Sequence, residues 1–113
     1  MKLVFISGPY KADTNWQIER NIRNAEIASL MVWKLGAVPI CVHTMNRHFF
    51  GEIDEERVIN GCMDIIMRCD AILMLSGWEE SAGSYMEYNF AMKNNVTVFT
   101  RIDELANWLE GKK

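Results

Sequence analysis

The sequence predicts an α/β fold in which a four-stranded parallel sheet lies between two layers of helices, a three-layer sandwich. Two observations carry this prediction. Short apolar runs alternate with longer stretches whose apolar residues recur every three or four positions. No linker, repeat or low-complexity stretch divides the 113 residues. Right-handed crossovers then favour the flavodoxin-like or Rossmann-like strand order 2-1-3-4 in a single domain over residues 1–113.

The predicted elements follow from the residue pattern of each stretch. Gly8-Pro9 ends the first apolar run, a buried strand, and Gly36 ends the long helix that follows. Pro39 lacks the N–H group that a central strand needs, so we expect the second strand at a sheet edge. In order, we predict a strand over residues 2–7, a helix over 16–35, a strand over 37–42, a polar loop over 43–51, a helix over 54–68, a strand over 71–75, a helix over 83–94, a strand over 96–100 and a closing helix over 103–109.

Composition and charge exclude several classes of protein. The net charge is −3 and no basic cluster occurs, which disfavours a nucleic acid polymer as partner. No apolar run approaches the ~20 residues of a membrane-spanning helix, and the N-terminal run is too short for a signal peptide. Cys41, Cys62 and Cys69 form no C-x-x-C pair, so we expect free thiols in a reducing compartment. We therefore predict a cytoplasmic protein that does not bind membranes.

Ligands of open α/β sheets bind beyond the carboxyl ends of the strands, where the strand order reverses. In the predicted order this point lies between the first and third strands. Three polar segments meet there: Ser7-Gly8-Pro9-Tyr10, His43-Thr44-Met45-Asn46, and Ser76 to Glu87. Within them we expect the ligand to be contacted by Ser7, Gly8, Pro9, His43, Gly77, Trp78, Ser81, Gly83 and Ser84.

The segment from Ser76 to Glu87 carries the most specific pattern. It leads from a strand through small hydroxyl and glycine residues into a helix N-terminus, whose free N–H groups bind anions. Ser81, Gly83 and Ser84 could therefore hold a phosphate, although Ser81 or Ser84 could also simply cap the helix. The segment is neither a Walker A motif nor a dinucleotide-binding fingerprint. A phosphate site beside a carboxylate indicates chemistry on a phosphorylated small molecule.

Glu87 lies one helical turn inside this anion site. The helix N-terminus stabilises an ionised carboxylate, so we expect Glu87 to be anionic at neutral pH and able to attack a carbon electrophile. The alternative is an ordinary glutamate on a solvated helix face. Tyr10 could hydrogen-bond Glu87 and fix its orientation, or it could only cover the rim of the sheet.

Two further residues keep two interpretations each. His43 could lie near the ligand or pack at a strand end, and Trp78 could contact a sugar or base or form a dimer contact. His43, His48 and Cys41 do not have a recurring zinc-ligand spacing. We predict neither a metal nor another cofactor.

One set of residues is shared with a known group of enzymes: Phe5-Ile6-Ser7-Gly8-Pro9-Tyr10, Pro39-Ile40-Cys41-Val42-His43-Thr44, Cys69-Asp70-Ala71, Gly77-Trp78-Glu79-Glu80-Ser81-Ala82-Gly83, Glu87 and Ala91. Through them nearly the whole chain resembles the nucleoside 2-deoxyribosyltransferase superfamily. It is most similar to a small bacterial and phage branch of unassigned function, related to nucleotide 5′-monophosphate N-glycosidases. The resemblance implies that Glu87 attacks the anomeric carbon of a nucleoside, displaces the base and forms a glycosyl-enzyme that a second base or water resolves. It also implies that Tyr10 orients this glutamate.

Ser81 narrows the substrate that the resemblance implies. Nucleoside transferases typically have an aspartate at this position for a free 5′-hydroxyl, whereas the nucleotide N-hydrolases have a serine for a 5′-phosphate. An aspartate would repel a phosphate that a serine can bind. We therefore expect a nucleoside 5′-monophosphate or a related phosphorylated riboside as the small-molecule partner.

The chain departs from the family pattern at the acid expected eight residues before Asp70, where it has Cys62. Asp64 is the nearest acid, but an offset of two residues turns it about 200° around a helix. Asp64 and Asn60 are therefore weak candidates for protonating the leaving base. Neighbouring subunits often complete such sites, so we expect a homodimer or higher homo-oligomer.

Three functions remain open on the sequence. The first is an enzyme that cleaves or transfers N-glycosidic bonds of nucleotides through Glu87. The second is a module of the same fold that binds or sequesters a nucleotide without turnover, which Cys62 in place of an acid favours. The third is a homodimeric protein with a vestigial pocket, in which Trp78 and surface methionines form the interface.

Overall fold

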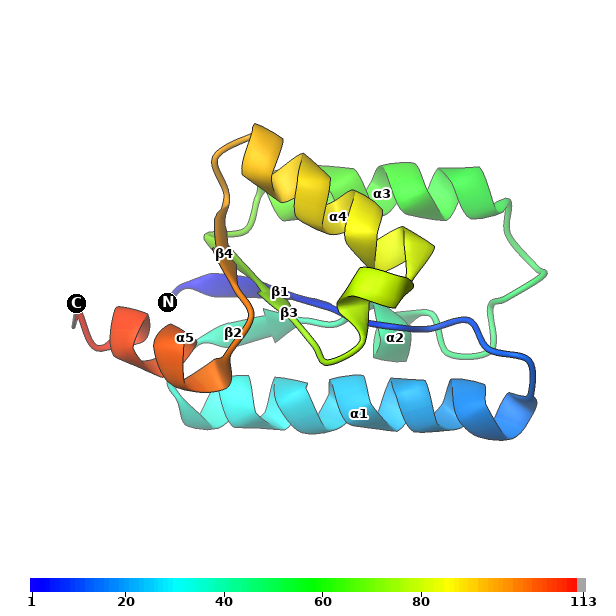
Figure 1. Cartoon of the computed structure of the whole chain (residues 1–113), viewed down its shortest axis with the longest axis horizontal. Coiled ribbons are helices and arrows are strands. Elements are labelled where there is room, and N and C mark those ends of the chain that lie inside the picture. The colour runs from blue at the N-terminus through cyan, green and yellow to red at the C-terminus, as the bar shows by residue number, and fades with distance from the viewer. Residues whose placement is uncertain (112–113) are drawn as a thin grey trace.

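The computed structural model describes residues 1–111, which form one four-stranded sheet with helices on both sides (Figure 1). Within this range every strand pairing is parallel and the strand order is β2-β1-β3-β4. The predicted α/β fold and its strand order are therefore confirmed. The elements are β1 (Leu3–Ser7), α1 (Asn15–Lys34), β2 (Val38–Ile40), α2 (Val42–Met45), α3 (Glu55–Met67), β3 (Ala71–Met74), the 3-10 turn η1 (Trp78–Glu80), α4 (Ala82–Lys93), β4 (Thr97–Phe99) and α5 (Ile102–Leu109).

The two central strands supply side chains to two separate cores. Successive residues of a strand point to opposite faces, so Val4 and Ile6 pack with α1 and α5, whereas Phe5 packs with α3 and α4. Figure 1 shows these two helix pairs on opposite sides of the sheet. Because both faces are covered, β1 and β3 are apolar along almost their whole length, as parallel strands in α/β proteins are.

The edge position predicted for the second strand is confirmed. Pro39 pairs with Val4 of β1, and β2 has no second neighbour in the described sheet. The missing N–H group of the proline therefore breaks no ladder on the open side.

The segment after β2 differs from the prediction. A loop was expected over residues 43–51 and a strand up to residue 42, but β2 ends at Ile40 and the helical turn α2 follows. The backbone N–H of Met45 and the hydroxyl of Thr44 both donate to the carbonyl oxygen of Cys41. A side chain that bonds back to the turn stabilises it locally, which a search for apolar periodicity cannot detect in so few residues.

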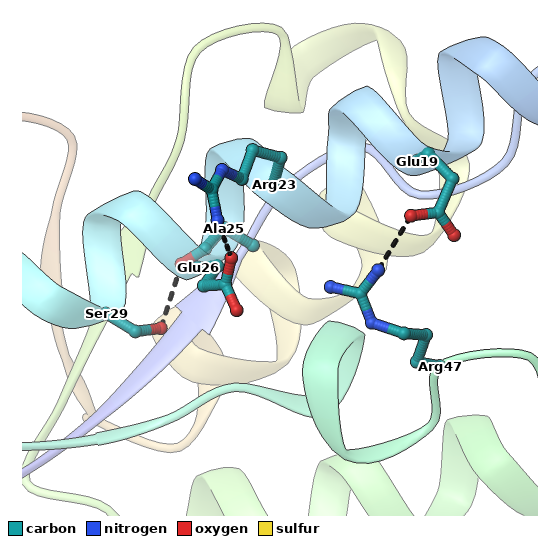
Figure 2. A network of polar contacts seen from close by, with 6 residues as sticks. All are labelled: Glu19, Arg23, Ala25, Glu26, Ser29 and Arg47. Atoms are coloured by element: carbon teal, nitrogen blue, oxygen red, sulfur yellow. Dashed lines mark hydrogen bonds and ion pairs between the residues drawn. The ribbon is translucent and has the colours of Figure 1, made fainter.

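One ion pair connects α1 to the segment that follows α2, and a second lies within α1 itself (Figure 2). A guanidinium nitrogen of Arg47 lies 2.7 Å from Glu19, and Arg23 pairs with Glu26 within the helix at 2.5 Å. Exposed pairs of this kind contribute less than about 1 kcal/mol each to stability, so their contribution to the fold is small. Even α1, the longest helix, is too polar to span a bilayer, and no other helix in residues 1–111 could do so.

Candidate functional site

Two loops pack tightly together at the carboxyl ends of β1 and β3. A Cβ atom on Gly8 would lie 3.0 Å from Leu75, so a larger residue would force the chains apart. Gly77 has a φ of +87°, a conformation that favours glycine, and a Cβ there would lie 3.3 Å from Pro9. The two glycines therefore allow the segments that the sequence placed at one sheet edge to make direct contact.

Glu87 on α4 points into this edge of the sheet. The hydroxyl of Ser7, the last residue of β1, donates a hydrogen bond of 2.5 Å to Oε1 of Glu87. The buried thiol of Cys62 on α3 is a second hydrogen-bond partner of the same carboxylate. One strand and two helices therefore fix this single carboxylate. This arrangement excludes the alternative of a glutamate on a solvated face.

Burial raises the pKa of Glu87 to about 7, and the hydrogen bonds from Ser7 and Cys62 only partly oppose the rise. This rise runs against the expectation that Glu87 is anionic at neutral pH. Loss of hydration disfavours the charged form more strongly than the helix N-terminus favours it. At neutral pH the carboxyl group is poised between its two protonation states.

The N-terminus of α4 presents unused hydrogen-bond donors beside Glu87. Ser81 caps the helix, and its hydroxyl accepts the N–H of Ser84 at 3.4 Å. The N–H groups of Ala82 and Gly83 have no partner within residues 1–111. The hydroxyl of Ser84 is buried and also without a partner. Ser84 precedes Glu87 by three residues, so the two side chains are neighbours on one face of the helix.

His43 forms hydrogen bonds to the backbone of the loop that follows β1. Its Nε2 lies 3.0 Å from the carbonyl oxygens of both Gly8 and Pro9. Carbonyl groups only accept, so Nε2 carries the proton and donates to them. Burial lowers the pKa of His43, which keeps the ring neutral. The interpretation of His43 as a residue packed at a strand end fits this geometry.

Tyr10 does not orient Glu87 in the structure. Its ring packs edge-on against His43 at a centroid distance of 5.4 Å, and its carbonyl oxygen accepts from Asn21. The hydrogen bond predicted between the phenol and Glu87 is not formed. Ser7 provides it instead, because its hydroxyl lies at the very end of β1.

Trp78 packs on tyrosines of α4. Its ring centroid lies 4.4 Å from that of Tyr88 and 6.0 Å from that of Tyr85. At 3.6 residues per turn, Tyr85 is nearly opposite Glu87 around the helix and Tyr88 is about 100° from it. The indole therefore covers a different flank of α4 from the one that carries the buried carboxylate.

Asp64 lies outside this group of residues. It is exposed on α3, in a shallow depression that Asn60 also lines, whereas Cys62 is on the buried side of the same helix. The rotation that the spacing predicted is thus observed. Residues 1–111 contain no cluster of three or more His, Cys, Asp or Glu side chains that could hold a metal ion.

A family model described as "Domain of unknown function (DUF4406)" matches residues 2–100. The chain belongs to this family. The match includes Ser7, Cys62 and Glu87, so the Glu87 carboxylate and both of its partners lie within the family's domain. No curated protein matches the chain. Membership of the DUF4406 family assigns no activity, and the function has to be inferred from the site.

Proposed function

We propose that this member of the DUF4406 family is similar in function to the nucleoside 2-deoxyribosyltransferase superfamily. It would cleave or transfer the N-glycosidic bond of a nucleoside 5′-monophosphate or a related phosphorylated riboside. The observation that carries the proposal is the Glu87 carboxylate, which is partly buried at the switch point of the sheet and accepts a hydrogen bond from Ser7 at 2.5 Å. Carboxylates with a purely structural role are seldom removed from water without a basic partner. Catalytic carboxylates often are.

The attack is the step that Glu87 performs in this proposal. Its ionised oxygen adds to the anomeric carbon as the base leaves, and water or a second base then displaces the glutamate with retention of configuration. The Ser7 hydroxyl holds the carboxylate in one rotamer and lowers its pKa. Because only the ionised form attacks, kcat/KM is expected to rise with pH through the pKa near 7.

The N-terminus of α4 supports a phosphate as the second recognition element. The free N–H groups of Ala82 and Gly83 are hydrogen-bond donors within about one and a half turns of Glu87, and the buried, unpartnered hydroxyl of Ser84 lies between them and Glu87 along the helix. An anion at this position also benefits from the helix dipole. A 5′-phosphate bound here would place the sugar next to the carboxylate.

A nucleotide-binding module without turnover is the second candidate. The observation that favours it is the neutral surroundings of Glu87, since its contacts within residues 1–111 are a hydroxyl and a thiol rather than a second acid.

Self-association remains a prediction for either function. Exposed Ile27, Leu30 and Trp33 on α1 offer an apolar surface for it.

The test is incubation with a panel of ribo- and deoxyribonucleoside 5′-monophosphates and chromatographic detection of free base. Base release that disappears in Glu87→Ala would support the enzyme. Binding without release, retained in Glu87→Gln but lost in Ser81→Asp, would support the binding module. If no nucleotide binds or is cleaved, both proposals are wrong.

A further inference from the structure

We propose that the site acts on N-ribosyl 5′-phosphates whose leaving base already carries a positive charge, such as a pyridinium ring. This inference rests on the proposed function, since it assumes attack by Glu87 on a ribosyl carbon. It adds the chemical class of the leaving group. Two features of the structure carry it. The groups around Glu87 are poor proton donors, and Glu87 has no oppositely charged partner within the described chain.

The groups that contact Glu87 are poor proton donors to a leaving base. The Ser7 hydroxyl donates to the carboxylate itself. The Cys62 thiol is hydrogen-bonded to the same group, and burial raises the pKa of this thiol to about 12. A general acid needs a pKa near the working pH, so neither group is suited to the role.

The other titratable residues near the sheet edge either donate their proton to another group or lie away from Glu87. The proton on Nε2 of His43 is directed to the carbonyls of Gly8 and Pro9. Asp64 faces solvent on α3. The Tyr10 ring lies against His43. The phenol of Tyr10 is the remaining proton donor among these residues, and a variant has to test it.

Leaving groups differ in their need for this proton. A neutral purine or pyrimidine departs as an anion unless an acid protonates it, whereas a pyridinium departs as a neutral molecule. In the second case the electron pair of the C1′–N bond moves onto the ring nitrogen, and an oxygen of Glu87 bonds to C1′. Water then adds to C1′, frees the carboxylate and releases one proton. The products are the neutral pyridine, ribose 5-phosphate and that proton.

Glu87 also lacks a counter-charge. None of the ion pairs within residues 1–111 involves it, although most of its surface is removed from water. An unpaired carboxylate that is largely removed from water is unfavourable, and a cation brought next to it relieves the cost. A cationic ring would therefore bind most tightly to the ionised form and would favour the state that attacks.

The decisive comparison uses nicotinamide riboside 5′-phosphate as the cationic probe and AMP and dGMP as neutral-base probes, each followed by release of free base. We expect release from the cationic probe to be at least about 100-fold faster. Equal or faster release from AMP or dGMP would overturn this inference and leave the proposed function intact. Failure of every probe, together with no binding or cleavage in the nucleotide panel above, would overturn the proposed function and this inference with it.

Variants test whether the lack of a proton donor is what slows cleavage of a substrate with a neutral base. Cys62→Asp would place an acid beside Glu87, and we expect it to accelerate AMP or dGMP cleavage at least about 10-fold over the matched variant Cys62→Asn. Thermal unfolding would confirm that both variants are folded. If neutral-base cleavage occurs in the unmodified protein and is lost in Tyr10→Phe, the phenol is the acid and the inference is wrong.

A binding measurement tests the counter-charge without any turnover. The ligands are carbocyclic analogues of nicotinamide riboside 5′-phosphate and of its reduced, neutral dihydro form, which lack the ring oxygen needed for cleavage. We expect about a 10-fold tighter Kd for the cationic analogue at pH 8, lost in Glu87→Gln. Equal binding of the two analogues to the unmodified protein would contradict the inference.

Discussion

Two carboxylates bind the two ends of the β1–β3 pair in opposite surroundings. At the amino end, exposed Asp70 accepts the backbone N–H of Leu3 at 2.8 Å. At the carboxyl end, Glu87 accepts the hydroxyl of Ser7 at 2.5 Å, and burial raises the pKa of Glu87 to about 7. Water solvates the first charge, whereas the second has no such compensation. Asp70 therefore stabilises the strands, whereas Glu87 is held at the sheet edge at a cost in hydration.

Removing the two carboxylates separates these roles most strongly in activity. We expect Glu87→Gln to lower base release by at least about 10³-fold, because an amide cannot replace the nucleophile. Asp70→Asn should stay within about 2-fold of the unmodified protein, since this side chain lies at the other end of the strands. Initial rates at saturating nucleotide measure both. An equally large loss in Asp70→Asn would remove the functional distinction between the two ends.

The pH dependence of stability gives the next largest effect. The pKa of Glu87 is raised on folding, so its protonated form stabilises the native state and this contribution is lost as pH rises from about 4.5 through 7. Glu87→Gln does not titrate. We therefore expect its stability relative to the unmodified protein to increase by on the order of 3 kcal/mol between pH 4 and pH 8. Urea unfolding at several pH values measures the difference, and a pH-independent difference would show that Glu87 is solvated.

Ser7→Ala sharpens the comparison at the carboxyl end. The Ser7 hydroxyl holds the Glu87 carboxylate and lowers its pKa, so its loss should raise that pKa further above 7. We expect kcat to fall roughly 10- to 100-fold and the acid limb of the pH–rate profile to move to higher pH. A lower rate without a shifted limb would mean that the serine has only a packing role.

The smallest effect belongs to the amino end. Asp70→Ala removes the acceptor for the Leu3 N–H, and we expect a loss of about 1 kcal/mol in unfolding free energy. The exposed position lets water replace part of the bond, so a loss above about 3 kcal/mol would contradict this account. Urea unfolding at pH 7 is sufficient, with Asp13→Ala as a control on a surface residue.

Much of the architecture could be predicted because its signals are local. The apolar runs gave β1 and β3, and Pro39 gave the edge strand, since each depends on neighbouring residues alone. The turn α2 was missed because a hydroxyl bond from Thr44, rather than periodicity, stabilises it. The positions of the other helices agree within two residues.

The residues that meet at this edge of the sheet could be grouped from the sequence, whereas their contacts could not. The switch-point rule and the glycines brought Gly8, Gly77 and Glu87 to one edge of the sheet. Which hydroxyl reaches Glu87 depends on distances between β1, α3 and α4, which the spacing of residues does not contain. The sequence therefore predicts a bond from Tyr10 where Ser7 makes it, and it does not reveal the effect of burial on the pKa of Glu87.

The most direct test of Glu87 as nucleophile is to trap the covalent intermediate. A nucleoside 5′-phosphate with fluorine at C2′ slows breakdown of a glycosyl-enzyme, because fluorine destabilises the cationic transition state. After incubation, digestion and mass spectrometry, we predict one added sugar phosphate on the peptide that contains Glu87, absent in Glu87→Gln. Base release from the same nucleotide with no adduct, or with an adduct on another residue, would contradict the central claim.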